Sequence, residues 1–246
     1  MFGILPLILA ANALADTLEE RKEAILRMEE TAATTEQLER KTRSESRLKD
    51  EGVPILPSLP VVESEVEARV RAESAVEERA LCLLVVALKG EGLEQEIVDK
   101  IIADYELDGL FSPKESEFIS SSDYSMQDRI NATWRYESAW IMLWALGFVD
   151  ELDRPDHIVD VPRAVTFMRE RSVEQFRSDA VLRPVAQILD EADLIYRYHW
   201  AVVDARVNSK DTPAGLEGGV VYERHYSLNW LIGYMDQEWD EITTDT

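Results

Sequence analysis

Helix-start signals recur along this chain, and they constrain its fold more than any other feature of the sequence. Ser112 is followed by Pro113 and then by Glu115, which combines an N-cap serine, a proline at the first helical position and a capping-box acid. A serine followed three residues later by an acid or an amide recurs at Ser64 with Glu67, Ser125 with Asp128, and Ser172 with Gln175. The apolar residues keep a helical period and show no strand alternation. We therefore predict an all-α protein, a single globular multi-helix domain with an N-terminal helical extension.

Apolar spacing and breakers place the individual helices. Helices are expected from Ser64 to about residue 88, over 97–105, from Pro113, from Ser125, from Ser172, from Pro184 to about Asn208, and over 220–235. Residues 139–149 are apolar for eleven positions, which indicates a central buried helix and is too short for a membrane span.

The N-terminal region differs from the rest. Residues 1–15 are apolar and end in Ala13, Leu14 and Ala15, a pattern typical of a signal cleavage site, but no basic residue precedes Arg21. We therefore expect a cytoplasmic protein, with export after cleavage near Ala15 as the alternative; an apolar helix packed on the body, or a mis-assigned start upstream of Met28, would also explain the run.

A domain boundary is expected just after Gly52. Residues 17–51 are rich in charge and suit an exposed or loosely docked helix. Residues 53–60 hold three prolines, which favours an extended linker. We therefore predict two regions: residues 1–52, an apolar segment and charged helical extension, and residues 53–246, the helical domain.

The charge of the chain restricts its partners. Asp and Glu number 49 and Lys and Arg 26, which gives a net charge of −23. Such a surface repels nucleic-acid phosphates and anionic lipid headgroups. We therefore expect no nucleic-acid partner and no stable membrane span, and a partner that is an unknown protein or small molecule.

Cysteine usage bears on metals and disulfides. The only cysteine, Cys82, lies in an apolar run and reads as a core residue. One thiol cannot form an intramolecular disulfide, and no Cys/His cluster is present to bind structural zinc. No cofactor and no metal site are predicted.

Five polar residues on two aromatic-rich helices are the candidate site. They are Asp193, Arg197, His199, Glu223 and His225, with Asp190 as a further acid. Asp193 lies four residues before Arg197, which places the two for a salt bridge, while His199 projects from an apolar stripe. If the helices pack together, the set could act as a general acid/base pair or a mixed His/carboxylate metal site. A network of structural hydrogen bonds is the alternative interpretation, and the one we favour.

Four long blocks of the sequence resemble one family. They are RSESRLKDEGVPILPSLP at 43–60, WRYESAWIMLWALGFVDEL at 134–152, ILDEADLIYRYHWAVVDARVN at 188–208 and GVVYERHYSLNWLIGYMDQEWDEITTDT at 219–246. Together they resemble the DUF4272 family, a bacterial domain of unknown function, from about Arg43 to Thr246. The resemblance implies no activity, ligand or catalytic residue.

Two hypotheses about function follow. The preferred one is a non-enzymatic binding or protein-interaction domain, because the chain combines a packed helical body with no recognisable catalytic motif. The alternative is a small-molecule hydrolase that uses the His/carboxylate cluster. A deep pocket lined by both His199 and His225 would favour the enzyme.

Overall fold

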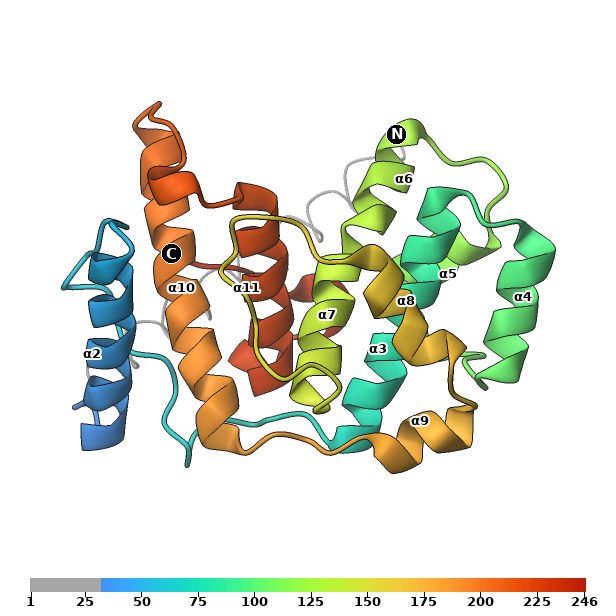
Figure 1. Cartoon of the computed structure of the whole chain (residues 1–246), viewed down its shortest axis with the longest axis horizontal. Helices are drawn as coiled ribbons and strands as arrows, with labels where there is room; N and C mark the ends of the chain where they lie inside the picture. The colour runs from blue at the N-terminus through green and yellow to red at the C-terminus, as the bar shows by residue number, and fades with distance from the viewer. Residues whose placement is uncertain (1–31) are drawn as a thin grey trace, which may run out of the picture.

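A computed structural model describes residues 32–246, and within them every regular element is a helix and none is a strand (Figure 1). The α-helices are α2 (Thr35–Asp50), α3 (Glu73–Glu91), α4 (Gln95–Asp104), α5 (Pro113–Ser120), α6 (Met126–Thr133), α7 (Arg135–Ala145), α8 (Val161–Arg169), α9 (Val173–Asp179), α10 (Val185–Val207) and α11 (Gly218–Ile232), and the 3-10 helices are η1 (Pro213–Gly215), η2 (Tyr234–Asp236) and η3 (Trp239–Glu241). The predicted all-α fold is confirmed over this range. The predictions about residues 1–15 lie outside the described residues.

The longer helices form a row across the molecule (Figure 1). In this row α2 packs on α10, α10 on α11, α11 on α7, and α7 on α3. The shorter helices α4, α5, α6, α8 and α9 surround α3 and α7. No helix within residues 32–246 is long and apolar enough to cross a membrane.

The apolar centre of the fold is the contact between α3 and α7. Residues 80–87 of α3 and residues 139–145 of α7 are all hydrophobic and buried. The central buried helix predicted from residues 139–149 is therefore observed, with its helical part ending at Ala145. Gly90 lets α6 approach α3, because a Cβ at this position would lie only 2.8 Å from the Cβ of Ala132.

Three of the predicted capping boxes are present. At Ser112, Ser125 and Ser172 the serine hydroxyl accepts a hydrogen bond from the backbone three residues later, and that residue's side chain accepts one from the serine backbone. The start of α2 has a fourth box, between Thr34 and Gln37. These local contacts satisfy the backbone donors of the first helical turn, which is why they mark the helix starts well.

The helix predicted from Ser64 is wrong at its start. The Ser64 hydroxyl does donate to the Glu67 carboxylate at 2.7 Å, but only a turn follows, and α3 begins at Glu73. The intervening backbone makes tertiary bonds instead: the N–H groups of Arg69 and Arg71 donate to carbonyls at the end of α11. These two donors satisfy acceptors that the helix end leaves open, so the chain stays extended there.

The helix predicted from Ser125 is interrupted at Trp134. This residue ends α6 and precedes the first residue of α7. Its ring lies against the first turn of α11, where a Cβ at Gly219 would come within 2.4 Å of the indole. The absence of a side chain at Gly219 therefore lets the indole pack on the α11 backbone.

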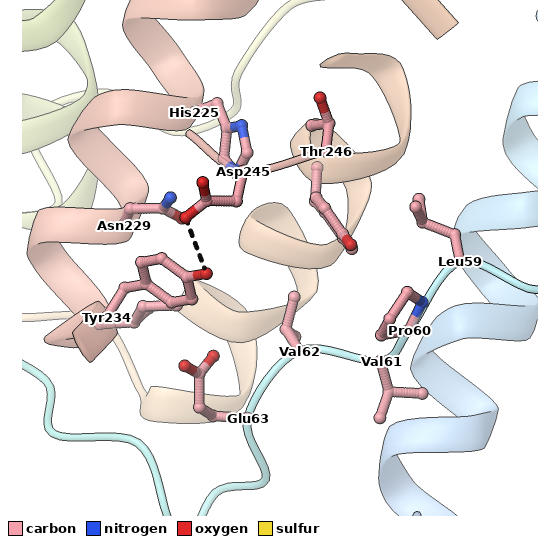
Figure 2. A pocket seen from close by; sticks show the side chains of 12 residues that line it. Leu59, Pro60, Val61, Val62, Glu63, His225, Asn229, Tyr234, Asp245 and Thr246 are labelled. Carbon is pink, nitrogen blue, oxygen red and sulfur yellow. Dashed lines mark hydrogen bonds between the residues drawn. The ribbon is translucent and has the colours of Figure 1, made fainter. Parts of the chain in front are cut away.

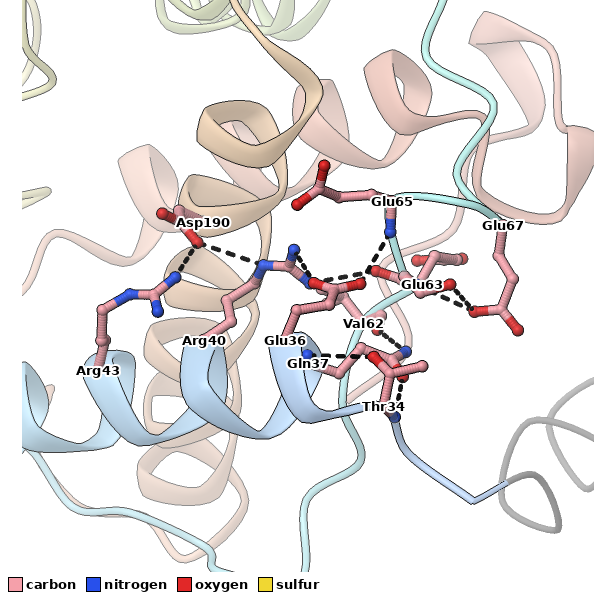
Figure 3. Close-up of polar contacts among 11 residues, drawn as sticks. Thr34, Glu36, Gln37, Arg40, Arg43, Val62, Glu63, Glu65, Glu67 and Asp190 are labelled. Atoms are coloured by element: carbon pink, nitrogen blue, oxygen red, sulfur yellow. Dashed lines mark hydrogen bonds and ion pairs between the residues drawn. The ribbon is translucent and has the colours of Figure 1, made fainter.

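Helix α2 is docked by polar side chains as well as by Leu48. Arg40 and Arg43 both donate to the Asp190 carboxylate of α10, at 3.3 and 2.6 Å (Figure 3). The Gln37 side chain donates to the backbone carbonyl of Val62 at 2.7 Å. The part of the predicted charged extension that the structure describes therefore contacts both α10 and the segment after the prolines.

Candidate functional site

The two candidate charges on α10 pair with each other. Arg197 donates to both carboxylate oxygens of Asp193, at 2.6 and 2.9 Å, which confirms the predicted salt bridge. Arg197 also donates to the carbonyl of Pro60 at 3.1 Å and lies 3.8 Å from Glu45 of α2. Asp193 is 0% exposed and Arg197 2% exposed. This pair is therefore a buried contact between α10, α2 and the extended segment.

Glu223 on α11 faces α7. Its carboxylate accepts hydrogen bonds from Arg135 and Ser138, both at 2.7 Å. Burial raises the pKa of Glu223, while the positive charge of Arg135 acts in the opposite direction. This acid is therefore engaged by α7 and does not contact the imidazoles.

His199 of α10 and His225 of α11 face each other. Their Nδ1 atoms are 2.7 Å apart, and the residues are 5% and 3% exposed. Burial, and secondarily the charge of Arg206, lowers the pKa of His199 to about 4; burial also lowers the pKa of His225, with His199 adding to the effect. Both rings are therefore neutral at physiological pH.

The five candidates thus form three separate contacts and not one cluster. The structure brings the two histidines together, pairs Asp193 with Arg197, and pairs Glu223 with Arg135. Each carboxylate is engaged by an arginine, so neither is placed to orient an imidazole. A catalytic role for any of the five stays a prediction.

His225 lines a pocket of about 300 Å³ (Figure 2). Its walls come from the segment after the prolines, from α10, from the end of α11 and from the C-terminal residues. The aliphatic lining residues are Leu59, Pro60, Val61, Val62 and Ile232, and the others are Glu63, Tyr196, His225, Asn229, Tyr234, Asp245 and Thr246. A largely apolar hollow with a few convergent polar groups is typical of a small-molecule site.

The polar groups of this pocket have defined partners. The Tyr234 hydroxyl donates to Asp245 at 3.3 Å, and the Asn229 amide nitrogen donates to the carbonyl of Thr243 at 2.8 Å. Burial raises the pKa of the Glu63 carboxyl. None of the described residues that line the pocket is Lys or Arg.

His199 lines a different and wider cavity of about 530 Å³. This second cavity lies between the end of α10 and the start of α11, and is lined by His199, Val202, Val203, Arg206, Lys210, Thr212, Gly218, Gly219 and Tyr222. The two imidazoles therefore do not share one cavity. Their hydrogen bond connects the walls of two.

Cys82 is buried in α3, and burial raises the pKa of its thiol to about 12, so it carries a proton at neutral pH. Within residues 32–246, no three His, Cys, Asp or Glu side chains are arranged to hold a metal ion.

Sequence reasoning missed most of the pocket. Glu63, Tyr196, Tyr234 and Asp245 were not singled out, and the segment that carries Glu63 follows a stretch read as a linker. The sequence does hold one weak signal for a structural role of this segment. Residues 53–60 lie in a block that resembles the family, and a linker without contacts would not be expected to share such a block. The convergence itself depends on tertiary packing, which local patterns do not report.

Comparison with known proteins identifies the family. A sequence model described as "Domain of unknown function (DUF4272)" matches residues 40–242, which is most of the chain and includes α3 to α11 and the pocket walls up to Ile232 and Tyr234. No curated protein and no solved structure matches the chain significantly. The chain therefore belongs to the DUF4272 family.

Proposed function

We propose that this protein is a non-enzymatic binding module whose ligand is a small molecule held in the pocket beside His225. The observation that carries the proposal is the pocket itself, with a volume of about 300 Å³ and a mainly apolar lining. Burial of an apolar ligand there would release water from both surfaces, and the few polar groups would orient it.

The polar network supports binding over hydrolysis. A general base in a hydrolase needs a proton acceptor near the substrate and usually a group that orients it. The candidate acids Asp193 and Glu223 are held by Arg197 and Arg135 instead. The alternative of a small-molecule hydrolase therefore gains less support from the contacts.

We base the proposed partner class on the net charge and the proposed location on the sequence of residues 1–15. A net charge of −23 supports the absence of a nucleic-acid partner. We propose a cytoplasmic location, with export after cleavage near Ala15 as the alternative. Sequencing the N-terminus of the protein from its native host distinguishes them: a chain that begins at Asp16 would support export.

A pocket-filling substitution tests the binding proposal. Val62 lines the pocket, so Val62→Trp should fill part of it, whereas Val66 is 95% exposed and Val66→Trp is the matched control. Ligand-observed NMR with a diverse library of small molecules should find compounds that bind the wild type and Val66→Trp but not Val62→Trp. The proposal is overturned if no compound binds, or if the compounds that bind are indifferent to Val62→Trp.

A further inference from the structure

The second cavity, which His199 lines, reverses the charge of the molecule locally. Its polar lining groups are the side chains of His199, Arg206, Lys210, Thr212 and Tyr222, with the backbone of Gly218 and Gly219. Each of these groups can donate a hydrogen bond, and none of the described lining residues is Asp or Glu. The whole chain, by contrast, holds 49 acidic and 26 basic residues.

The two cations of this cavity have no counter-ion. Arg206, in the last turn of α10, and Lys210, in the loop that follows, are both exposed. Neither side chain forms an ion pair or a hydrogen bond with a described residue. Arg43, which is also exposed, pairs with Asp190 at 2.6 Å. Two unpaired cations that line one cavity favour an anionic occupant.

A buried imidazole lies beside these cations. His199 is 5% exposed, and its Nδ1 atom is used by His225 at a distance of 2.7 Å. Its Nε2 atom forms no hydrogen bond with a described residue, although buried polar atoms normally have a partner. Burial, and secondarily the charge of Arg206, lowers the pKa of His199. An anion between the ring and the guanidinium would offset that charge and could accept a hydrogen bond from Nε2.

The first turn of α11 adds to the side-chain donors. Gly218 and Gly219 both line the cavity. The carboxylate of Glu217, the N-cap, accepts a hydrogen bond from the N–H of Gly219 at 3.3 Å and does not line the cavity. The N–H of Gly218 has no acceptor among the described residues. A helix N-terminus of this kind favours an oxyanion, in support of the charged groups.

The remaining lining suits an organic group. Val202 and Val203 line the cavity, and the Tyr222 ring packs edge-on against His199 with ring centroids 5.9 Å apart. The volume of about 530 Å³ is within the range of small-molecule sites. The cavity therefore has room for a body attached to the anionic group.

We propose that the second cavity binds a phosphate monoester. The phosphate group lies among His199, Arg206 and Lys210. Its organic group lies against Val203 and Tyr222. This site is separate from the pocket of the proposed function, goes beyond that function and does not depend on it.

A phosphate monoester matches the donors better than a carboxylate does. Its phosphate carries a charge of about −1.5 to −2 at pH 7 and three acceptor oxygens, whereas a carboxylate offers one charge and two oxygens. The net charge of −23 does not prevent binding, because charges more than about 8 Å away are largely screened at physiological salt.

Two probes test the ligand class on the full chain by isothermal titration calorimetry, at neutral pH and physiological salt in a buffer without phosphate. They are phenyl phosphate and benzoate, which share the aromatic ring and differ in the anionic group. Phenyl phosphate should bind at least about tenfold more tightly than benzoate, which corresponds to about 1.4 kcal/mol.

Variants assign the binding to the second cavity. Arg206→Gln and Lys210→Gln should each weaken phenyl phosphate binding about tenfold, because each removes a charge-assisted contact. Arg169→Gln is the matched control, since Arg169 is an exposed arginine in the last turn of α8. Val62→Trp, which fills the other pocket, should also leave the affinity unchanged.

The histidine signals give a second measurement that needs no variant. The chain has three histidines, and phenyl phosphate should shift the imidazole NMR signals of His199. His157 is the internal control, because its side chain is 62% exposed and pairs with Asp156.

The proposal is overturned if phenyl phosphate does not bind, if benzoate binds as tightly, or if neither Arg206→Gln nor Lys210→Gln weakens binding. Loss of binding in Val62→Trp would place phenyl phosphate in the other pocket, which would overturn this proposal and support the proposed function. Failure of the proposed function, tested with other compounds at Val62, would leave the phosphate site unaffected.

Discussion

The middle of the α3–α7 contact and the α10–α11 contact are both buried, but they differ in how many polar side chains they bury. Residues 80–87 of α3 and 139–145 of α7 are buried and hydrophobic. By contrast, α11 buries a run of polar side chains, namely Glu223, Arg224, His225, Ser227 and Asn229, and α10 buries Asp193, Arg197 and His199. Both pairs contribute to the apolar core, and the α10–α11 pair also carries the two histidines that line the two cavities.

The contrast explains how the two pairs respond to change. When a buried apolar side chain is truncated, the free energy of unfolding falls with the number of atoms removed, and the neighbouring side chains partly fill the cavity. A buried ion pair can contribute little net stability, yet removing one partner leaves a desolvated charge. A single substitution in the α10–α11 pair should therefore cost more stability than one in the α3–α7 pair, and four experiments test this difference.

The largest effect is expected for Arg197→Met. The variant leaves Asp193, which is 0% exposed, without its arginine. The free energy of unfolding should fall by about 3–5 kcal/mol, measured by urea denaturation. The double variant Asp193→Leu, Arg197→Met should recover much of that loss; a single-variant loss within error of zero would show that the pair is not desolvated.

A somewhat smaller loss is expected in the apolar pair. Leu143→Ala removes a fully buried side chain of α7 and should lower the free energy of unfolding by about 2–5 kcal/mol. Leu38→Ala on α2 is the control, because Leu38 is 50% exposed. A loss at position 38 equal to that at 143 would contradict the assignment of the core.

The histidine pair predicts a pH dependence that the apolar pair lacks. Burial lowers the pKa of His199 from 6.5 to about 4, so between these values the unfolded chain binds protons that the folded protein does not. The stability due to this group is complete above about pH 6.5 and is lost as the pH falls toward about 4. Denaturation at several pH values should show a smaller decline for the His199→Phe, His225→Phe double variant. A decline equal to that of the wild type would refute the assignment.

The smallest effect is expected one helical turn from the buried pair. Arg43 donates to Asp190 at 2.6 Å, but the two side chains are 59% and 43% exposed. Arg43→Ala should change the free energy of unfolding by about 0.2–1 kcal/mol, and the change should shrink in high salt. A loss as large as that of Arg197→Met would mean that exposure does not distinguish the two ion pairs.

The fold could be predicted from the sequence wherever its determinants are local. The boxes at Ser112, Ser125 and Ser172 use contacts within four residues, and they mark observed helix starts. The same signal at Ser64 failed because backbone donors further along the chain bond to the end of α11. The packing of Trp134 likewise involves a glycine 85 positions away, at 219, which local patterns do not report.

The candidate site was predictable in its parts but not in its arrangement. The spacing of Asp193 and Arg197 predicted their salt bridge, because both lie on one helix. The partners of Glu223 and His225 come from α7 and α10, so nothing in the local pattern could assign them. Glu63 could not be identified because the chain around it has no regular structure from which to infer a neighbour.

In the Nδ1–Nδ1 hydrogen bond between His199 and His225, one ring is the donor and the other is the acceptor. With both rings neutral, only one of the facing nitrogens carries a proton, so the rings hold opposite tautomers. The ring that donates has a bare outer nitrogen, and the ring that accepts has a protonated one. A hydrogen bond to the outer nitrogen of one ring therefore fixes whether the outer nitrogen of the other ring is a donor or an acceptor. The position of a single hydrogen therefore sets the tautomers of two rings that line two different cavities.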